Sequence, residues 1–180
     1  LASLVGSEMC IRDSYLMIRF GVNTNQIMVN IVTSYNDLNK LSPLIDMLLK
    51  EIPEITSMVN NVNTRKSDVS FGEYETLVFG KPYIEEKIGD LTFEISANSF
   101  FQTNTYQGQK LYQEVEKAAN LTGDEVIFDL YCGTGTIGLY LAKKAKEVYG
   151  FEVIRSSLED AEKNAEKNNV PPCHILLSKE

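Results

Sequence analysis

The residues of this chain that could carry chemistry are concentrated in one short stretch, residues 129–138 (DLYCGTGTIG). Gly133, Gly135 and Gly138 form the pattern GxGxxG between an apolar run and an amphipathic segment. Glycines at such positions let the backbone turn tightly and approach a ligand closely, because no β-carbon intervenes. The pattern indicates a cofactor site, but by itself it fits dinucleotides as well as other ligands.

Two acidic residues beside the glycines discriminate between cofactor classes. Asp129 lies near the end of an apolar run, before the first glycine, where its carboxylate would repel a pyrophosphate but not the cationic end of S-adenosylmethionine. Glu152 follows the next apolar run, and a carboxylate there is placed to accept hydrogen bonds from the two ribose hydroxyls of an adenosine. We therefore favour S-adenosyl-L-methionine over NAD. The structural alternatives are a cap on the turn for Asp129 and a solvated strand end for Glu152.

The other reactive side chains indicate neither a nucleophile nor a metal site. Cys132 lies inside the glycine loop without a histidine or basic residue near it in sequence, so we interpret it as a small packed hydrophobe. The three cysteines and the single histidine, His174, lack the spacing of metal ligands. Free thiols without a secretory signal indicate the cytoplasm, and no apolar run reaches the roughly 20 residues that span a bilayer.

The elements around the glycine loop alternate between strand and helix. They predict the first half of a Rossmann-like parallel sheet of the doubly wound α/β class. Ser156 and Glu159 are spaced as a capping box, and Gly123 is placed to end a preceding helix. The expected strands are residues 125–131, 147–153 and 174–177, and the expected helices are residues 105–120, 136–146 and 156–168.

The N-terminal half predicts a different architecture. Short β-rich runs with tight turns indicate an antiparallel sheet, and a helix capped by Asn36 or Asp37 is expected to pack on it. Residues 1–14 show no clear period, and we interpret them as a non-native leader. We therefore expect three segments: the leader at 1–14, a central antiparallel α+β domain at 15–98, and an incomplete Rossmann-like domain at 99–180.

Several segments together resemble the bacterial RNA (uracil-C5)-methyltransferase family, whose members modify uridines in 23S ribosomal RNA and in transfer RNA. The two most specific are SFFQTNT and DLYCGTGTIGLYLA, and a generic methyltransferase would share only the second. The resemblance runs from about residue 15 to the end, through residues 60–63, 77–80, 99–105, 129–142 and 150–153.

The resemblance implies a cofactor and a set of site residues. The cofactor is S-adenosyl-L-methionine, and the cofactor-binding residues are Gln102, Tyr131 and Glu152, together with Gly133 and Gly135 of the glycine loop. An amide such as that of Gln102 can hydrogen-bond the polar tail of the cofactor, although it could also cap the following helix. We expect no metal ligand among these residues.

The reaction implied by the resemblance needs residues that this chain is not expected to carry. In such enzymes a cysteine thiolate adds to C6 of an unstacked uracil, C5 takes the methyl group, and a carboxylate base removes the C5 proton. The family places both residues downstream of the third strand, so we expect this piece to be inactive alone and assign catalysis to the parent protein. The most favoured substrate is 23S ribosomal RNA, with transfer RNA as an alternative, and a monomer without membrane attachment is expected.

The charge of the chain limits any claim of RNA binding. The formal net charge is −8 and the isoelectric point is near 4.8, whereas phosphate contacts require clustered Lys and Arg. An RNA-binding β-barrel, which many family members carry, could supply the basic surface. Two alternatives stay open: an NAD-dependent dehydrogenase and a non-catalytic RNA-interaction module built on residues 15–98.

Overall fold

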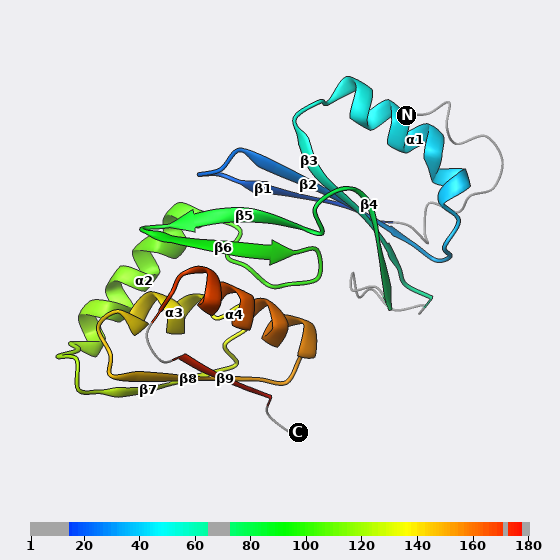
Figure 1. The fold of residues 1–180 in the computed structure, drawn as a ribbon. Helices are drawn as coiled ribbons and strands as arrows, with labels where there is room; N and C mark the ends of the chain where they lie inside the picture. Colours follow the sequence, from blue (N-terminus) through cyan, green and yellow to red (C-terminus); the bar gives the residue numbers. More distant parts are fainter. Residues whose placement is uncertain (1–14, 65–72, 171–172, 178–180) are drawn as a thin grey trace. The chain divides into compact units, whose positions relative to one another are not determined.

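The computed structural model describes residues 15–64, 73–170 and 173–177. The chain divides into two compact units (Figure 1). Of the described residues, the first unit holds 15–20 and those within 26–82, and the second holds 21–25 and those from Tyr83 onward. The second unit is therefore discontinuous in sequence, because a five-residue turn between the first two strands folds with it.

The first unit is a four-stranded sheet in the order β1-β2-β3-β4 with one helix on it. Asp37 caps the helix by accepting a hydrogen bond from the amide of Lys40, as predicted, and the helix buries Leu41 against Val29, Ile31 and Met58 of the sheet. The elements are β1 (Tyr15–Gly21), β2 (Gln26–Thr33), α1 (Leu38–Glu51), β3 (Ile55–Val62) and β4 (Tyr74–Gly80).

One strand pair of this sheet differs from the antiparallel expectation. β3 and β4 are antiparallel, but β2 and β3 run parallel, with Val29 opposite Met58. The reason is that α1 carries the chain back across the sheet before β3 begins, whereas a tight turn would have reversed it.

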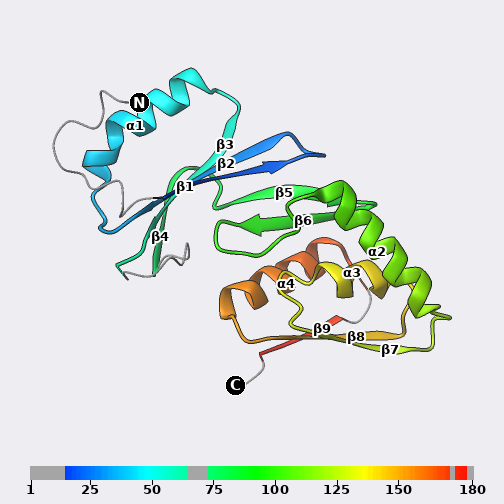
Figure 2. The same cartoon turned by 180° about the vertical axis from the view of Figure 1, so that it is seen from behind.

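The second unit has three layers, visible from both sides in Figures 1 and 2. Helices α3 and α4 lie between the β5–β6 hairpin and the parallel sheet β7-β8-β9. The elements are β5 (Tyr83–Ile88), β6 (Leu91–Ser96), α2 (Thr105–Ala119), β7 (Val126–Leu130), α3 (Thr136–Ala142), β8 (Glu147–Glu152), α4 (Arg155–Lys167) and β9 (Cys173–Leu177). The predicted fold class, with a parallel Rossmann-like half after the first α+β segment, is confirmed.

Several local predictions differ from the structure. The β5–β6 hairpin, expected within residues 15–98, folds with the second unit because Asn164 of α4 hydrogen-bonds the backbone of β6. The predicted capping box is wrong: Ser156 lies inside α4, whose N-cap is Ile154. α2 ends at Asn120 in the left-handed conformation and not at Gly123. The segment expected as a leader, residues 1–14, lies outside the described residues, and the boundary between residues 98 and 99 stays a prediction for the family's domains.

Candidate cofactor-binding site

The predicted glycine loop joins the carboxyl end of β7 to the start of α3. Gly135 is the N-cap of α3 with φ of 78°, and a β-carbon on it would lie 3.3 Å from Ala161 of α4. A β-carbon on Gly138 would lie 2.9 Å from the Asp129 carboxylate. These two glycines are therefore required for a left-handed turn and for close packing of the loop onto its neighbours.

Asp129 points into this turn. Its Oδ2 accepts a hydrogen bond of 2.8 Å from the amide of Gly138, and burial raises the pKa of the carboxyl, while the Gly138 amide opposes that shift. The hydrogen bond that Asp129 makes is thus a cap on the turn, which is the structural alternative given for this residue in the sequence analysis. A direct electrostatic role toward a cationic cofactor stays a prediction.

Glu152, the last residue of β8, is only 6% exposed, which excludes the alternative of a solvated strand end. Its Oε2 accepts from the amide of Gly133 at 2.9 Å. Its Oε1 accepts from the amides of Val153 at 2.7 Å and Ile154 at 2.8 Å. These bonds fix the carboxylate beside the glycine loop and fill both lone-pair sites of Oε1, which leaves one site on Oε2 for a ligand hydroxyl.

Tyr131 has an unusual backbone conformation. Its φ is 60° and its side chain is 82% exposed. The other non-glycine residues with positive φ in the described part of the chain are asparagines, which tolerate that region better than a bulky aromatic residue. Strain of about 1–3 kcal/mol at such a position is typical of ligand-binding sites. The backbone therefore supports a functional role for this loop.

Cys132 does not act as a nucleophile in this arrangement. Its side chain is 7% exposed, and burial, with smaller contributions from Asp129 and Glu152, raises the pKa of the thiol to about 12. A β-carbon on Gly150 of β8 would lie 3.0 Å from its Sγ. The prediction of a small packed hydrophobe is confirmed.

Gln102 lies apart from the glycine loop in sequence, on the segment between β6 and α2. A β-carbon built on Gly108 of α2 would lie 3.2 Å from the Cβ of Gln102, so the first atom of the Gln102 side chain packs close to that helix. Asn104 and not Gln102 caps α2, by accepting from the amide of Gln107 at 3.0 Å. The capping alternative for Gln102 is therefore excluded, and its cofactor role stays a prediction.

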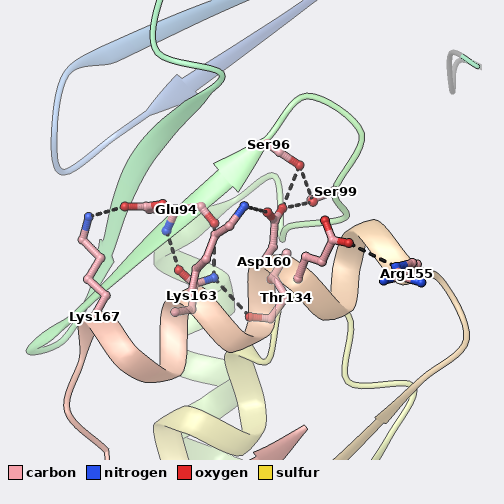
Figure 3. A network of polar contacts seen from close by, with 10 residues as sticks. Glu94, Ser96, Ser99, Thr134, Arg155, Asp160, Lys163 and Lys167 are labelled. Atoms are coloured by element: carbon pink, nitrogen blue, oxygen red, sulfur yellow. Dashed lines mark hydrogen bonds and ion pairs between the residues drawn. The ribbon is translucent and has the colours of Figure 1, made fainter. Parts of the chain in front are cut away.

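Two buried carboxylates that sequence reasoning missed hold the segment around Gln102. Glu86 of β5, 1% exposed, accepts from the hydroxyl of Thr105 at 2.9 Å and from the amides of Val22 at 2.6 Å and Asn23 at 3.0 Å. Asp160 of α4 accepts from the hydroxyl of Ser99 (Figure 3). Neither carboxylate lies in a recognisable motif, and their partners are distant in sequence, so no local pattern could have found them.

The site has the composition expected for an adenosine-containing cofactor. Gly133, with φ of 57°, has open space where a β-carbon would project; its amide donates to Glu152, and Tyr131 lies two residues before it in the chain. Among the described residues there is no group of three or more metal-ligating side chains, and none of the described helices is long and apolar enough to cross a membrane. A glycine loop after the first strand of a parallel sheet, with a carboxylate ending the second, defines the class of Rossmann-like nucleotide-cofactor domains.

Comparison with known proteins narrows this class. The family described as tRNA (Uracil-5-)-methyltransferase matches residues 46–180, so the chain belongs to that family. An uncharacterized RNA methyltransferase of Chlorobaculum tepidum is 47% identical over 156 residues, which are 86% of this chain and 32% of that protein. One of Listeria innocua is 45% identical over 164 residues, 91% of this chain and 36% of that protein. The chain thus spans about a third of the length of these curated relatives.

Solved structures agree with the family assignment. The tRNA (uracil-54, C5)-methyltransferase of Pyrococcus abyssi, solved with S-adenosyl-L-homocysteine, superposes with a TM-score of 0.76 at 36% identity. The match covers 93% of this chain and 40% of that one. A tRNA m1G37 methyltransferase of M. jannaschii, 14% identical with a TM-score of 0.53, shares the fold. The predicted resemblance to RNA methyltransferases is confirmed. The predicted cofactor, S-adenosyl-L-methionine, agrees with the S-adenosyl-L-homocysteine bound to the Pyrococcus abyssi enzyme.

Proposed function

We propose that this chain binds S-adenosyl-L-methionine and forms the cofactor-binding part of an enzyme that methylates C5 of a uridine in RNA. The observation that carries the proposal is Glu152, a buried carboxylate fixed by three backbone amides beside Gly133. The Pyrococcus abyssi relative, named as a tRNA (uracil-54, C5)-methyltransferase in complex with S-adenosyl-L-homocysteine, supports the ligand and the reaction.

Each residue has a distinct part in holding the cofactor. Glu152 accepts a hydrogen bond from a ribose hydroxyl at the remaining site of Oε2, and Tyr131, Gly133 and Gly135 present backbone to the ligand. Gln102 hydrogen-bonds the polar amino-acid tail. The bound cofactor supplies the methyl group, and the role of these residues is to hold and orient it.

The RNA substrate is the least specified part of the proposal. The sequence favours 23S ribosomal RNA, whereas the names of the family and of the Pyrococcus abyssi enzyme favour transfer RNA. The whole protein, incubated with tritiated cofactor and each RNA separately, is expected to label one of them with 5-methyluridine. Label in neither RNA, or on another base, contradicts uracil-C5 methylation. A monomer acting in the cytoplasm completes the proposal.

Binding of S-adenosyl-L-homocysteine to this chain, measured by titration calorimetry, tests the cofactor site. Glu152→Gln replaces a charged acceptor by a neutral amide, and we expect affinity to fall at least about tenfold, because hydrogen bonds to charged groups contribute about 1.5–3 kcal/mol. Gln102→Ala is expected to weaken binding similarly. The matched control is Glu147→Gln, at the opposite end of β8, whose carboxylate accepts from the hydroxyl of Tyr149.

The same titration with NADH distinguishes the competing enzyme class. Tight NADH binding with no binding of S-adenosyl-L-homocysteine would reverse the assignment to a dehydrogenase. Unchanged affinity for S-adenosyl-L-homocysteine in both Glu152→Gln and Gln102→Ala would instead show that the cofactor lies elsewhere.

A further inference from the structure

α4 carries a row of polar side chains on the face that it turns toward β6 and the glycine loop. Asp160, Asn164 and Asn168 follow one another at intervals of four residues, which places them on one side of a helix. Asp160 is 6% exposed and Asn164 is fully buried. Buried polar groups are costly unless hydrogen-bonded, so the partners of these side chains show which segments they hold. Figure 3 shows Asp160 with Ser96 and Ser99.

Asp160 holds the beginning of the segment that carries Gln102. Its Oδ2 accepts from the hydroxyl of Ser96 at 2.7 Å and from the hydroxyl of Ser99. The two serine hydroxyls also contact each other at 2.7 Å, and Lys163 lies 4.0 Å from the other carboxylate oxygen. Ser99 is itself 1% exposed, so this contact is shielded from water.

Asn164 holds the glycine loop. Its amide nitrogen donates to the carbonyl of Thr134 at 3.2 Å, and also to the carbonyl of Glu94 at 3.2 Å. Its amide oxygen accepts from the backbone amide of Glu94 at 2.7 Å. One side chain therefore joins the edge of β6 to the backbone between Gly133 and Gly135.

Asn168 makes the same kind of contact one turn later without reaching the glycine loop. It accepts from the amide of Thr92 at 2.9 Å and donates to its carbonyl at 2.8 Å. The chain thus contains a natural control for Asn164: the same side chain, on the same helix, bonded to the same strand.

We propose that Asp160 and Asn164 are positioning residues for the cofactor. They set the segment bearing Gln102 and the glycine loop at a fixed spacing, so that both contact one ligand. This inference rests on the proposed function, since it requires that the two segments share S-adenosyl-L-methionine. Fixing groups before the ligand arrives removes the cost of ordering them on binding, which is why their loss lowers affinity.

The test is titration calorimetry of S-adenosyl-L-homocysteine with the full 180-residue chain, at a temperature where circular dichroism shows every variant folded. We expect Asp160→Ala and Asn164→Ala each to weaken binding at least about tenfold, a loss of the size of one hydrogen bond to a charged or buried group. Asn168→Ala is expected to lower thermal stability but to leave affinity within about twofold. Asp160→Asn keeps an acceptor oxygen for one serine and is expected to recover part of the affinity.

A double-mutant cycle separates positioning from a general loss of structure. If Asp160 acts through Gln102, then Asp160→Ala has little further effect in a chain that already carries Gln102→Ala. Where Asp160→Ala does not fold, Ser99→Ala removes the same bond from the other side, and the same cycle applies.

Four outcomes would contradict the inference. The positioning role is overturned if Asp160→Ala and Asn164→Ala bind like the unsubstituted chain, or if Asn168→Ala weakens binding as much as they do. It is also overturned if the losses from Asp160→Ala and Gln102→Ala simply add. Failure of the unsubstituted chain to bind S-adenosyl-L-homocysteine overturns the proposed function, and this inference with it.

Discussion

Asp129 shows how burial of a single ionisable residue affects the stability of the chain. Its carboxyl is held in the turn between β7 and α3, where burial raises the pKa above its ordinary value. A folded-state pKa above the unfolded value means that the protonated form is favoured by folding. The associated stability is present at low pH and is lost as pH rises through the raised pKa, starting near the unfolded value of about 3.9.

Asp129→Asn removes that pH dependence. The amide oxygen can still accept from Gly138, and the side chain cannot ionise. We therefore expect the urea midpoint of the variant, measured from pH 4 to pH 7 relative to the unsubstituted chain, to increase as pH rises above about 4 and to level off once the pH exceeds the raised pKa of Asp129. Asp124→Asn, at an exposed carboxylate just before β7, is the control. A flat difference for Asp129→Asn across this range, or a decrease, contradicts the assignment of a raised pKa.

At the residue scale, the sequence located the residues of the candidate site but not the hydrogen bonds that hold them. The glycines, Asp129 and Glu152 lie within one short stretch and at the next strand end, so their spacing carries the information. The bond from the Gly133 amide to Glu152 could not be foreseen, because it depends on the left-handed path of the loop at Tyr131 and Gly133. Asp160 contacts Ser99, 61 residues away, and no local pattern encodes such a pair.

At the scale of elements, side chains of α4 cover the open edge of the β5–β6 hairpin. Among the strands that the structure describes, β5 and β6 pair only with each other, so an open strand edge of the kind that promotes aggregation is exposed unless something covers it. Asn164 and Asn168 bond the backbone amides and carbonyls of Glu94 and Thr92 on that edge, as a neighbouring strand would. The helix therefore replaces a third strand.

Asn168→Ala tests this edge contact. The substitution leaves the amide and the carbonyl of Thr92 without their partner, and we expect the free energy of unfolding to fall by about 1–3 kcal/mol. Hydrogen exchange, followed by mass spectrometry, is expected to speed up in peptides containing β6. Glu162→Ala, exposed on the same helix, serves as the control. Equal exchange in both variants would mean that Asn168 does not protect the strand.

Element type was easier to predict than element pairing. Apolar runs and helical periodicity located the strands and helices because those patterns are local. The parallel pairing of β2 with β3 and the placement of the β5–β6 hairpin depend on where α1 and α4 pack, which is a tertiary property. The capping box at Ser156 was wrong because α4 begins one residue earlier, at Arg155, with Ile154 as its N-cap.

At the scale of the whole molecule, the second unit is made of two separate stretches of the sequence. Residues 21–25 belong to it, although the strands on both sides of this turn belong to the first unit. The turn bonds to β5: Asn23 donates to the carbonyl of Lys87 at 2.7 Å, and the hydroxyl of Thr24 donates to the carbonyl of Glu85. A substitution that removes a hydrogen bond within one unit should therefore destabilise that unit, even where the substituted residue lies between strands of the other unit in the sequence.

A pair of threonine substitutions tests that division. Thr24→Val removes a hydroxyl that bonds β5, and Thr56→Val removes a hydroxyl of β3 that donates to the carbonyl of Ile27 and accepts from its amide, both at 3.0 Å. Each loss is expected to cost about 1 kcal/mol. We expect Thr24→Val to speed hydrogen exchange in β5 and β6 while sparing β3 and β4, and Thr56→Val to do the reverse. Faster exchange in β3 and β4 on substituting Thr24, with β5 unchanged, would place the turn in the first unit instead.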